Sequence, residues 1–187
     1  LEKGEIIVYP TDTLYGLGID PTQESAVKRL CRLKQRSLGA GLPLIAASLT
    51  QVETFLGALP GLGRLLCERF WPGPLTLVFT PKSTINIGVC AADGSVAVRV
   101  PRCLVARRLA ELSDHPITAT SANLSGMKSA STAEGVASQL VGQIDLVLGQ
   151  KGPLGGSAST IVDVRGNEPV LIRDGVIAWN RVLQSIN

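Results

Sequence analysis

Residues 8–18 read VYPTDTLYGLG and decide how the chain begins to fold. The run EIIVYP at residues 5–10 has the apolar, β-branched composition of a buried strand, which Pro10 ends. A chain reversal needs little more than one glycine or proline. Here the strand is followed by many groups that suit turns or ligands: Pro10, Thr11, Asp12, Thr13, Gly16 and Gly18. The stretch therefore carries more polar chemistry than a simple turn requires.

Length and composition favour one domain over residues 1–187, because 45% hydrophobic residues are enough for a substantial core. No apolar run approaches the roughly 20 residues of a membrane span, so we expect no membrane partner and no signal peptide. The four cysteines are scattered and form no close pair, which is unlike a disulfide or zinc framework. We interpret them as reduced, buried thiols of a cytoplasmic protein.

The charge balance is mildly basic, with a net charge of +3 at pH 7. This fits a protein that handles anions, but it lacks the clustered lysines and arginines of a strong nucleic-acid binder. Aromatic residues make up only 4% of the chain, which leaves few platforms for stacking bases.

Short apolar runs alternate with amphipathic segments along the whole chain. This order predicts an α/β (α+β) fold, a three-layer α/β/α domain around a twisted mixed sheet. A parallel dinucleotide-binding sheet is disfavoured because no glycine fingerprint follows the first strand. Thr50 and Glu53 have the spacing of a capping box at a helix start. We expect strands at 5–10, 42–47, 75–80, 95–100, 117–120, 145–148, 160–164 and 169–173, and helices at 22–34, 50–59, 61–70, about 105–112, 132–140 and the C-terminus.

Several polar clusters lie where predicted elements end. TSANLSG at residues 120–126 places Ser121, Asn123 and Ser125 directly after a buried strand, and GGSAST at 155–160 is a second hydroxyl-rich loop. Such loops can be plain serine or asparagine turns, or they can bind an anion through many donors. Lone arginines stand mid-strand at Arg99 and at a strand end at Arg173. Together they predict a pocket for a polyanion.

The pair Lys34 and Arg36, in LKQRS at residues 33–37, follows a predicted helix. Cations there complement the helix dipole, and a solvated last turn is the simpler interpretation. His115 is the only histidine, and no cysteine or carboxylate stands near it at ligand spacing, so we assign it a structural or solvent role. No phosphate-binding P-loop motif occurs. Hydroxyls, amides and arginines without an obvious base suit nucleotidyl transfer, where positioning and charge neutralisation do most of the work.

Six motifs, in this order, resemble the YrdC-like family: YPTDTLYGLG, LKQRS, RFWPGPLTLVF, VAVRVP, TSANLSG and STIVDV…LIRDG. The resemblance runs over nearly the whole chain. It implies an α/β/α fold with a concave, positively charged cleft. It also implies threonylcarbamoyl-AMP synthesis, in which L-threonine, bicarbonate and ATP give threonylcarbamoyl-adenylate and pyrophosphate. The product is then used to modify tRNA beside the anticodon.

The resemblance also implies roles for single residues. The residues implied to bind threonine are Thr13, Arg99, Ser121 and Ser159, with Thr11 and Tyr15 shaping the wall. Those implied to bind ATP are Arg36, Ser95, Asn123, Ser131 and Arg173, with Lys34 completing the basic pair. The catalytic group is then Lys34, Arg36, Ser121 and Asn123. Mg²⁺ would act on the ATP phosphates, and no residue of the chain is expected to ligate a metal.

The chain departs from the family pattern at Ser37, where proline is common, and at Ala40, where the family often has an ATP contact. The family also tends to carry a helix before the first strand, whereas this sequence starts at Leu1, three residues before Gly4, so that either the start is trimmed or the ordered part begins late. The resemblance implies a downstream tRNA-modifying complex as partner and a possible tRNA or RNA contact at the basic cleft. Two alternatives stay open: a noncatalytic RNA-binding module, and a YciO-like or HypF-like enzyme that makes another carbamoyl-adenylate.

Overall fold

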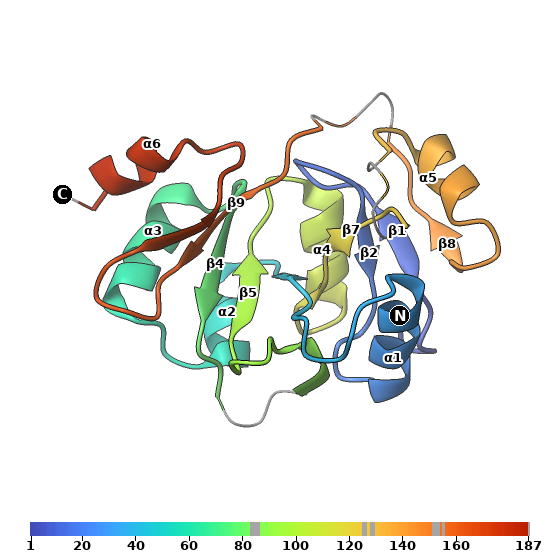
Figure 1. Cartoon of the computed structure of the whole chain (residues 1–187), viewed down its shortest axis with the longest axis horizontal. Coiled ribbons are helices and arrows are strands. Elements are labelled where there is room, and N and C mark those ends of the chain that lie inside the picture. The colour runs from blue at the N-terminus through green and yellow to red at the C-terminus, as the bar shows by residue number, and fades with distance from the viewer. Residues whose placement is uncertain (83–86, 125–126, 128–129, 151–153, 155, 187) are drawn as a thin grey trace.

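The structure, a computed structural model, describes residues 1–82, 87–124, 127, 130–150, 154 and 156–186 (Figure 1). Its strands form two sheets, one of six strands and one of four. The strands are β1 Ile7–Tyr9, β2 Gly16–Gly18, β3 Leu44–Ile45, β4 Leu75–Phe79, β5 Val96–Arg99, β6 Ile117–Thr118, β7 Thr120–Ser121, β8 Leu146–Val147, β9 Thr160–Asp163 and β10 Val170–Arg173. The helices are α1 Glu24–Leu33, α2 Leu49–Leu56, α3 Gly61–Phe70, α4 Leu104–Leu112, α5 Ala133–Gln139 and α6 Trp179–Gln184, with a 3₁₀ turn η1 at Ile87–Val89.

The six-stranded sheet has the order β10-β9-β4-β5-β3-β6, and the four-stranded sheet has the order β7-β2-β1-β8. Both sheets are mixed. β4 runs parallel to β9 and antiparallel to β5, while β1 runs parallel to β8 and antiparallel to β2. These pairings confirm the mixed α/β class predicted from the sequence.

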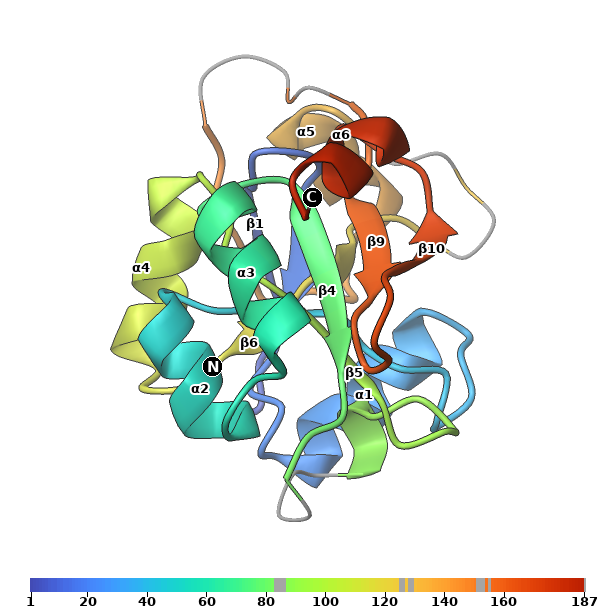
Figure 2. The same cartoon turned by 90° about the vertical axis from the view of Figure 1, so that its left-hand side faces the viewer.

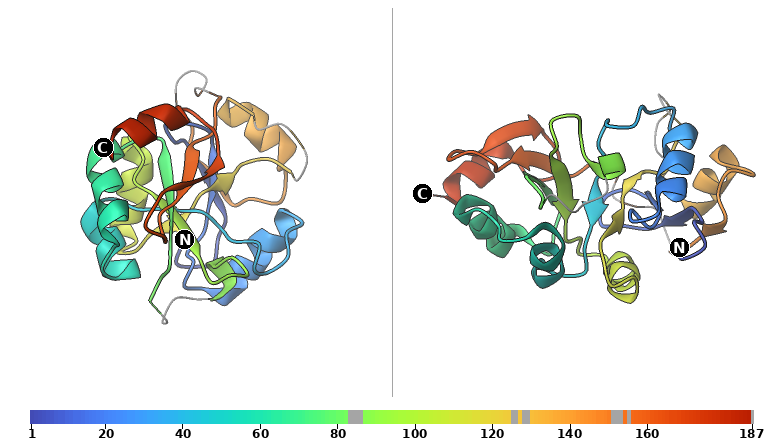
Figure 3. Two further views of the ribbon diagram at one scale, coloured as in Figure 1. Left: turned by 60° about the vertical axis from the view of Figure 1, so that its left-hand side comes forward. Right: turned by 90° about the horizontal axis from the view of Figure 1, so that it is seen from below.

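Helices cover both faces of the strands, which makes three layers. Along β1, Val8 lies in the main core together with Val27 and Leu30 of α1. Its neighbours Ile7 and Tyr9 point to the opposite face, into a smaller core that includes Ala106 and Ala110 of α4. This division follows from the two-residue period of a strand. α2, α3 and α4 gather along one side of the strands (Figure 2), while α1 and α5 lie at the same end of the molecule (Figures 1 and 3).

The expected single sheet is instead divided in two, and the division falls inside the predicted strand 117–120. β6 pairs with β3 in the larger sheet, whereas β7 pairs with β2 in the smaller one. Between them, the Ala119 amide donates to the Pro43 carbonyl at 2.7 Å. The chain therefore crosses from one sheet to the other at this residue, and a space is left between the sheets.

The strand β2, Gly16–Gly18, was not predicted from the sequence, where these residues were assigned to the polar turn after the first strand. The antiparallel register places Gly18 opposite Ile7 and Gly16 opposite Tyr9. A Cβ at position 18 would lie 2.7 Å from Cε1 of the Tyr9 ring. Glycine is therefore required for close packing against Tyr9, although it is generally unfavourable inside a strand.

The start of α2 also differs from the prediction. Its N-cap is Ser48, whose hydroxyl accepts a hydrogen bond from the Gln51 amide at 3.1 Å, so Thr50 and Glu53 do not form the cap. Gln51 Oε1 reaches back and accepts from the Ala47 amide at 2.8 Å. The predicted kind of cap is therefore present, but it begins at Ser48 instead of Thr50. Ser48 and Gln51 have the same spacing as Thr50 and Glu53.

Candidate active site

A cavity of about 310 Å³ opens at the junction of the two sheets. It draws polar side chains from six places in the sequence: the β1–β2 turn, the segment after α1, β4, the end of β5, the end of β7 and the β9–β10 hairpin. These polar side chains are Thr11, Thr13, Tyr15, Arg36, Thr76, Arg99, Thr120, Ser121, Ser159 and Arg173. Such a set of hydroxyls and guanidiniums suits an anionic ligand.

The β1–β2 turn is held by its own threonines. The Thr11 hydroxyl accepts from the amides of Thr13 and Leu14 at 3.1 and 3.2 Å, and donates to the Leu14 carbonyl at 2.7 Å. The Thr13 hydroxyl lies 2.9 Å from that of Thr11. Either hydroxyl can be the donor of this contact. The contacts of Thr11 therefore hold the turn and bring the Thr13 hydroxyl against it.

Arg99 lies at the end of β5 and binds this turn from the other sheet. Its Nη1 donates to Asp12 Oδ1 at 2.5 Å, and its Nη2 donates to Thr13 Oγ1 at 3.2 Å. The side chains of Arg99 and Asp12 are only 7% and 13% exposed, so this is a nearly buried ion pair. Asp12 Oδ2 is buried without a hydrogen-bond partner among the described residues. Asp12 belongs to the polar turn, but nothing in the sequence indicates that it pairs with Arg99.

Lys34 follows α1 and is 3% exposed, which excludes a solvated helix end. Its ammonium donates to the carbonyls of Ser121 and Asn123 at 2.8 and 2.5 Å, and to Asn123 Oδ1 at 3.0 Å. Asn123 Oδ1 also accepts from the Ser121 hydroxyl at 2.6 Å. Lys34 therefore fixes the backbone and side chains of the loop that follows β7.

Burial is the main reason that the pKa of Lys34 falls to about 8, and the positive charge of Arg36 lowers it further. Arg36 itself is exposed and lines the cavity. The two residues of the basic pair thus have different surroundings: Lys34 lies under a loop, whereas Arg36 presents its charge to the cavity.

On the opposite wall, Ser159 is held by two neighbours. Its hydroxyl lies 2.8 Å from that of Thr76 on β4, and the two residues are 8% and 4% exposed. Arg173 Nη2 donates to the Ser159 carbonyl at 2.8 Å and to its hydroxyl at 3.2 Å. Partial burial, and secondly the charge of Arg99, lower the pKa of Arg173. Thr76 was missed because one threonine inside an apolar strand gives no signal in the sequence.

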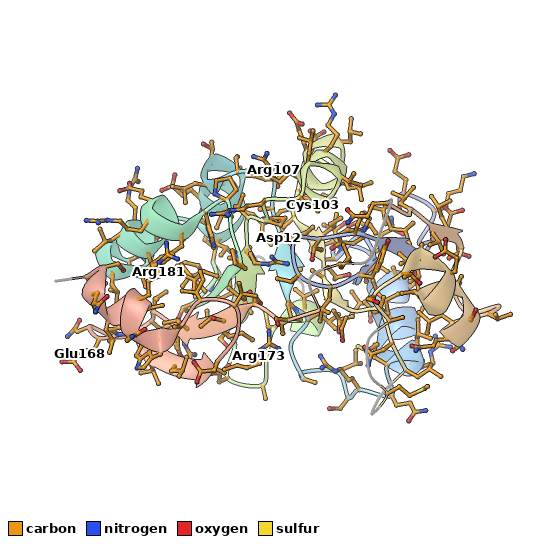
Figure 4. All side chains as sticks on the ribbon, turned by 90° about the horizontal axis from the view of Figure 1, so that it is seen from above. Asp12, Cys103, Arg107, Glu168, Arg173 and Arg181 are labelled. Atoms are coloured by element: carbon orange, nitrogen blue, oxygen red, sulfur yellow. The ribbon has the colours of Figure 1, made fainter. Side chains whose placement is uncertain are left out.

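Six of the predicted site residues line the cavity: Thr13, Arg36, Arg99, Ser121, Ser159 and Arg173. Thr11 and Tyr15 line it as well. Figure 4 shows Arg173, which lines the cavity, and Asp12, the partner of Arg99, in the middle of the molecule.

The other four predicted residues lie outside this lining. Lys34 and Asn123 are buried behind Ser121 in the loop described above. Ser95 precedes β5, where its amide donates to Asp93 Oδ1 at 3.0 Å. Ser131 is exposed, and its carbonyl accepts from the Leu154 amide at 3.0 Å. Ser125 lies outside the described residues.

His115 has a carboxylate neighbour that the sequence spacing did not indicate. Its Nε2 lies 3.3 Å from Asp20 Oδ1, a residue almost a hundred positions earlier. No group of three or more histidines, cysteines, aspartates or glutamates that could hold a metal occurs in the described part of the chain. The same residues contain no helix long and apolar enough to cross a membrane.

The structure is a mixed α/β domain with guanidiniums and hydroxyls around a cavity between two sheets, an arrangement suited to small anionic molecules. Residues 1–175 match the Sua5/YciO/YrdC family, described as telomere recombination. The chain belongs to this family, which confirms the resemblance of the six motifs.

Two relatives are named threonylcarbamoyl-AMP synthase. The protein of Pyrococcus abyssi is 37% identical over 175 residues, which are 94% of this chain and 52% of that protein. The protein of Vibrio vulnificus is 38% identical over 150 residues, which are 79% of this chain and 81% of that protein. The chain thus spans about half the length of the archaeal relative but most of the bacterial one.

Two solved structures have the same fold. P. abyssi Sua5 complexed with L-threonine superposes with a TM-score of 0.90 at 36% identity, covering 98% of this chain and 54% of that one. E. coli YciO superposes with a TM-score of 0.84 at 29% identity, covering 95% of this chain and 86% of that one. Both confirm the mixed α/β architecture.

Proposed function

We propose that this chain is a threonylcarbamoyl-AMP synthase domain, which converts L-threonine, bicarbonate and ATP to L-threonylcarbamoyladenylate, pyrophosphate and water. The observation that carries the proposal is the cavity at the sheet junction, where three arginines face the same space as the hydroxyls of Thr13, Ser121 and Ser159. The names of the relatives support the same activity.

In this proposal the amino acid binds between the β1–β2 turn and Ser159. Arg99 has five N–H donors, and two of them are engaged with Asp12 and Thr13. The remaining donors hold the threonine carboxylate, for which a guanidinium is well matched. Thr13, Ser121 and Ser159 pair with the polar groups of threonine. A site that pairs with a hydroxyl rejects analogues lacking it far better than a shape-only pocket.

The nucleotide enters as its magnesium complex, so Mg²⁺ belongs to the substrate. Arg36 and Arg173 are the cavity arginines without an acidic partner among the described residues, and they receive the phosphates. A cavity of about 310 Å³ is near the lower limit for ligand pockets. It suits an amino acid and the reacting phosphate, while the rest of ATP extends outside. Asn123, Ser95 and Ser131 are the proposed contacts for that outer part, and Lys34 positions Asn123.

The proposed reaction needs little proton transfer from the protein. The amine nitrogen of threonine forms a bond to the bicarbonate carbon, and one bicarbonate oxygen leaves as water. An oxygen of the resulting carbamate then attacks the α-phosphorus, and the bond from that phosphorus to the bridging oxygen of pyrophosphate breaks. Arg36 and Ser121 stabilise the charge that develops on the phosphates, while Lys34 and Asn123 keep Ser121 in place.

We place the activity in the cytoplasm, in support of tRNA modification beside the anticodon. None of the four cysteines, all of which the structure describes, forms a disulfide, and a reducing compartment is compatible with this. The partners we propose are a downstream tRNA-modifying complex, which would take up the adenylate, and tRNA or another RNA at the basic cleft.

Pyrophosphate release with each substrate omitted in turn tests the assignment. Release should require ATP, threonine and bicarbonate together, because the attacking oxygen exists only in the carbamate. Release that continues without threonine would reject the assignment. If carbamoyl phosphate then replaced threonine and bicarbonate, a HypF-like reaction would be indicated. RNA binding without any pyrophosphate release would favour a noncatalytic module.

A further inference from the structure

A second pocket, of about 330 Å³, lies where α3 ends, β4 begins and the chain approaches α6. We call it the arginine pocket, and define it by Arg69, Arg102, Arg181, Phe70 and Trp71. It shares no lining residue with the cavity at the sheet junction among the described residues. Figure 4 shows the separation, with Arg181 on α6 and Arg173 in the middle of the molecule.

The charges of this pocket are of one sign. Its described lining holds three arginines and no acidic residue, and none of the three takes part in an ion pair among the described residues. Arg64, on the same helix as Arg69, pairs with Glu53 and Glu68 at 2.8 and 3.1 Å. Three guanidiniums gathered in one hollow repel one another, so an anion that neutralises them is favoured there.

The aromatic rings of the pocket are fixed in place. Trp71 Nε1 donates to the Leu75 carbonyl at 2.6 Å, which sets the orientation of the indole. The Arg181 guanidinium lies 6.0 Å from the centre of the Phe70 ring, as in a cation–π contact. Arg102 Nε donates to the Pro72 carbonyl at 3.3 Å, but no acidic side chain neutralises the three guanidiniums among the described residues. An indole held beside them matches a ligand with a flat ring and a phosphate, because bases stack on aromatic side chains while phosphates pair with arginine.

We propose that the arginine pocket binds a nucleotide unit, with its phosphate among Arg69, Arg102 and Arg181 and its base against Trp71. The proposal does not depend on the reaction assigned to the other cavity. The nucleotide can be free or part of a single strand, since both present the same chemistry. The pocket is connected to the other cavity through the backbone: Thr160 donates to Pro74 at 3.2 Å, and Val176 donates to Ala158 at 3.0 Å. A bound nucleotide therefore lies beside the segment that carries Ser159.

Tryptophan fluorescence reports on this pocket directly. The chain has two tryptophans, so a Trp179→Phe background leaves Trp71 as the single emitter. AMP and hexaadenylate serve as the probes for a free nucleotide and a strand. Saturable quenching by either supports the proposal and identifies the source. If neither AMP nor hexaadenylate quenches the fluorescence of Trp71, the proposal is overturned.

The matched variants Arg69→Gln and Arg64→Gln distinguish binding in the arginine pocket from a general effect of net charge. Both residues lie on α3 and each substitution removes one positive charge, but only Arg69 lines the pocket. Arg69→Gln should weaken binding of the quenching probe by about threefold, as expected for one exposed ionic contact. Arg64→Gln should leave it unchanged. The association constant of hexaadenylate falls with salt. In the otherwise wild-type chain, Arg69→Gln should make the slope of its logarithm against the logarithm of the salt concentration less steep by about 0.7. Equal weakening by the two variants would overturn the proposal.

Discussion

Replacing Thr13 with valine tests whether the β1–β2 turn binds substrate or only shapes the chain. Valine keeps the β-branched shape but exchanges the hydroxyl for a methyl group. The hydroxyl has two partners in the structure, Thr11 Oγ1 at 2.9 Å and Arg99 Nη2 at 3.2 Å. Thr13→Val therefore removes both contacts while Asp12 continues to hold Nη1 of Arg99.

The expected loss of stability follows from these contacts. Thr13 is 5% exposed and Arg99 is 5% exposed, so the released N–H of Arg99 is poorly placed to find water. Leaving such a donor unpaired costs about 1–3 kcal/mol. For a chain of 187 residues, about 2 kcal/mol corresponds to a fall of about 4–8 °C in Tm. The Michaelis constant for threonine should rise by about tenfold if Thr13 also pairs with the substrate, since about 1.4 kcal/mol is a typical single contact.

A loss of stability alone cannot distinguish the two roles, so a matched control is needed. Thr118 is fully buried, and its hydroxyl also has two partners, the Leu17 carbonyl and the Ile19 amide, both at 3.0 Å. Thr118 does not line the cavity. Thr118→Val should lower Tm by a similar amount without changing the Michaelis constant for threonine. Thr13→Ser, which keeps the hydroxyl, should return both Tm and this Michaelis constant to their wild-type values. If Thr13→Val has a lowered Tm but the wild-type Michaelis constant for threonine, Thr13 only stabilises the turn and the proposed contact with threonine is wrong.

Three further predictions concern other parts of the site. Arg36→Ala should weaken ATP binding by about tenfold or more while threonine binding is unchanged, and Arg32→Ala, at the end of α1, should change neither in calorimetry. The pKa of Lys34 is lowered from 10.5 to about 8, so the unfolded chain holds a proton that the folded chain has lost between these pH values. The free energy of unfolding of the wild type, relative to Lys34→Met, should thus increase by about 3 kcal/mol from pH 8 to 10.5; a flat difference would contradict the lowered pKa. Thr76→Val should raise the threonine constant and Thr76→Ser should restore it, because only the latter can hold the Ser159 hydroxyl.

The elements that depend on local patterns were predicted well. The helix expected at 22–34 forms as α1 and buries Val27, Leu30 and Cys31. Glu24 and Lys28, four residues apart, pair outside this face at 2.6 Å. Periodicity and spacing within one helix are enough for both results. The division of the sheet was not predicted, because the run 117–120 looks like one strand until its partners are known. Residues 117–118 pair with β3 and residues 120–121 pair with β2. These partners depend on the whole fold and cannot be inferred from the residues of the run itself.

The same limit explains the candidate site. Sequence patterns indicated the polar loops at strand ends. The family resemblance implied ten site residues, and six of them line one cavity. Neither indicated which cations are already engaged. The Arg99–Asp12 and Lys34–Asn123 contacts join residues 87 and 89 positions apart. A basic residue after a helix is solvated in most contexts, and only the packing of α1 against the loop after β7 makes Lys34 a buried donor.

These two long-range contacts divide the positive charge of the site into structural and available parts. Arg99 crosses from the larger sheet to the β1–β2 turn of the smaller one, and much of its charge is balanced by Asp12. The charge of Lys34 is surrounded by three oxygen atoms of the loop after β7. Arg36 and Arg173 then remain as the cavity cations without an acidic partner among the described residues. We therefore expect the phosphates of a nucleotide, more highly charged than a single carboxylate, to bind where these two arginines lie.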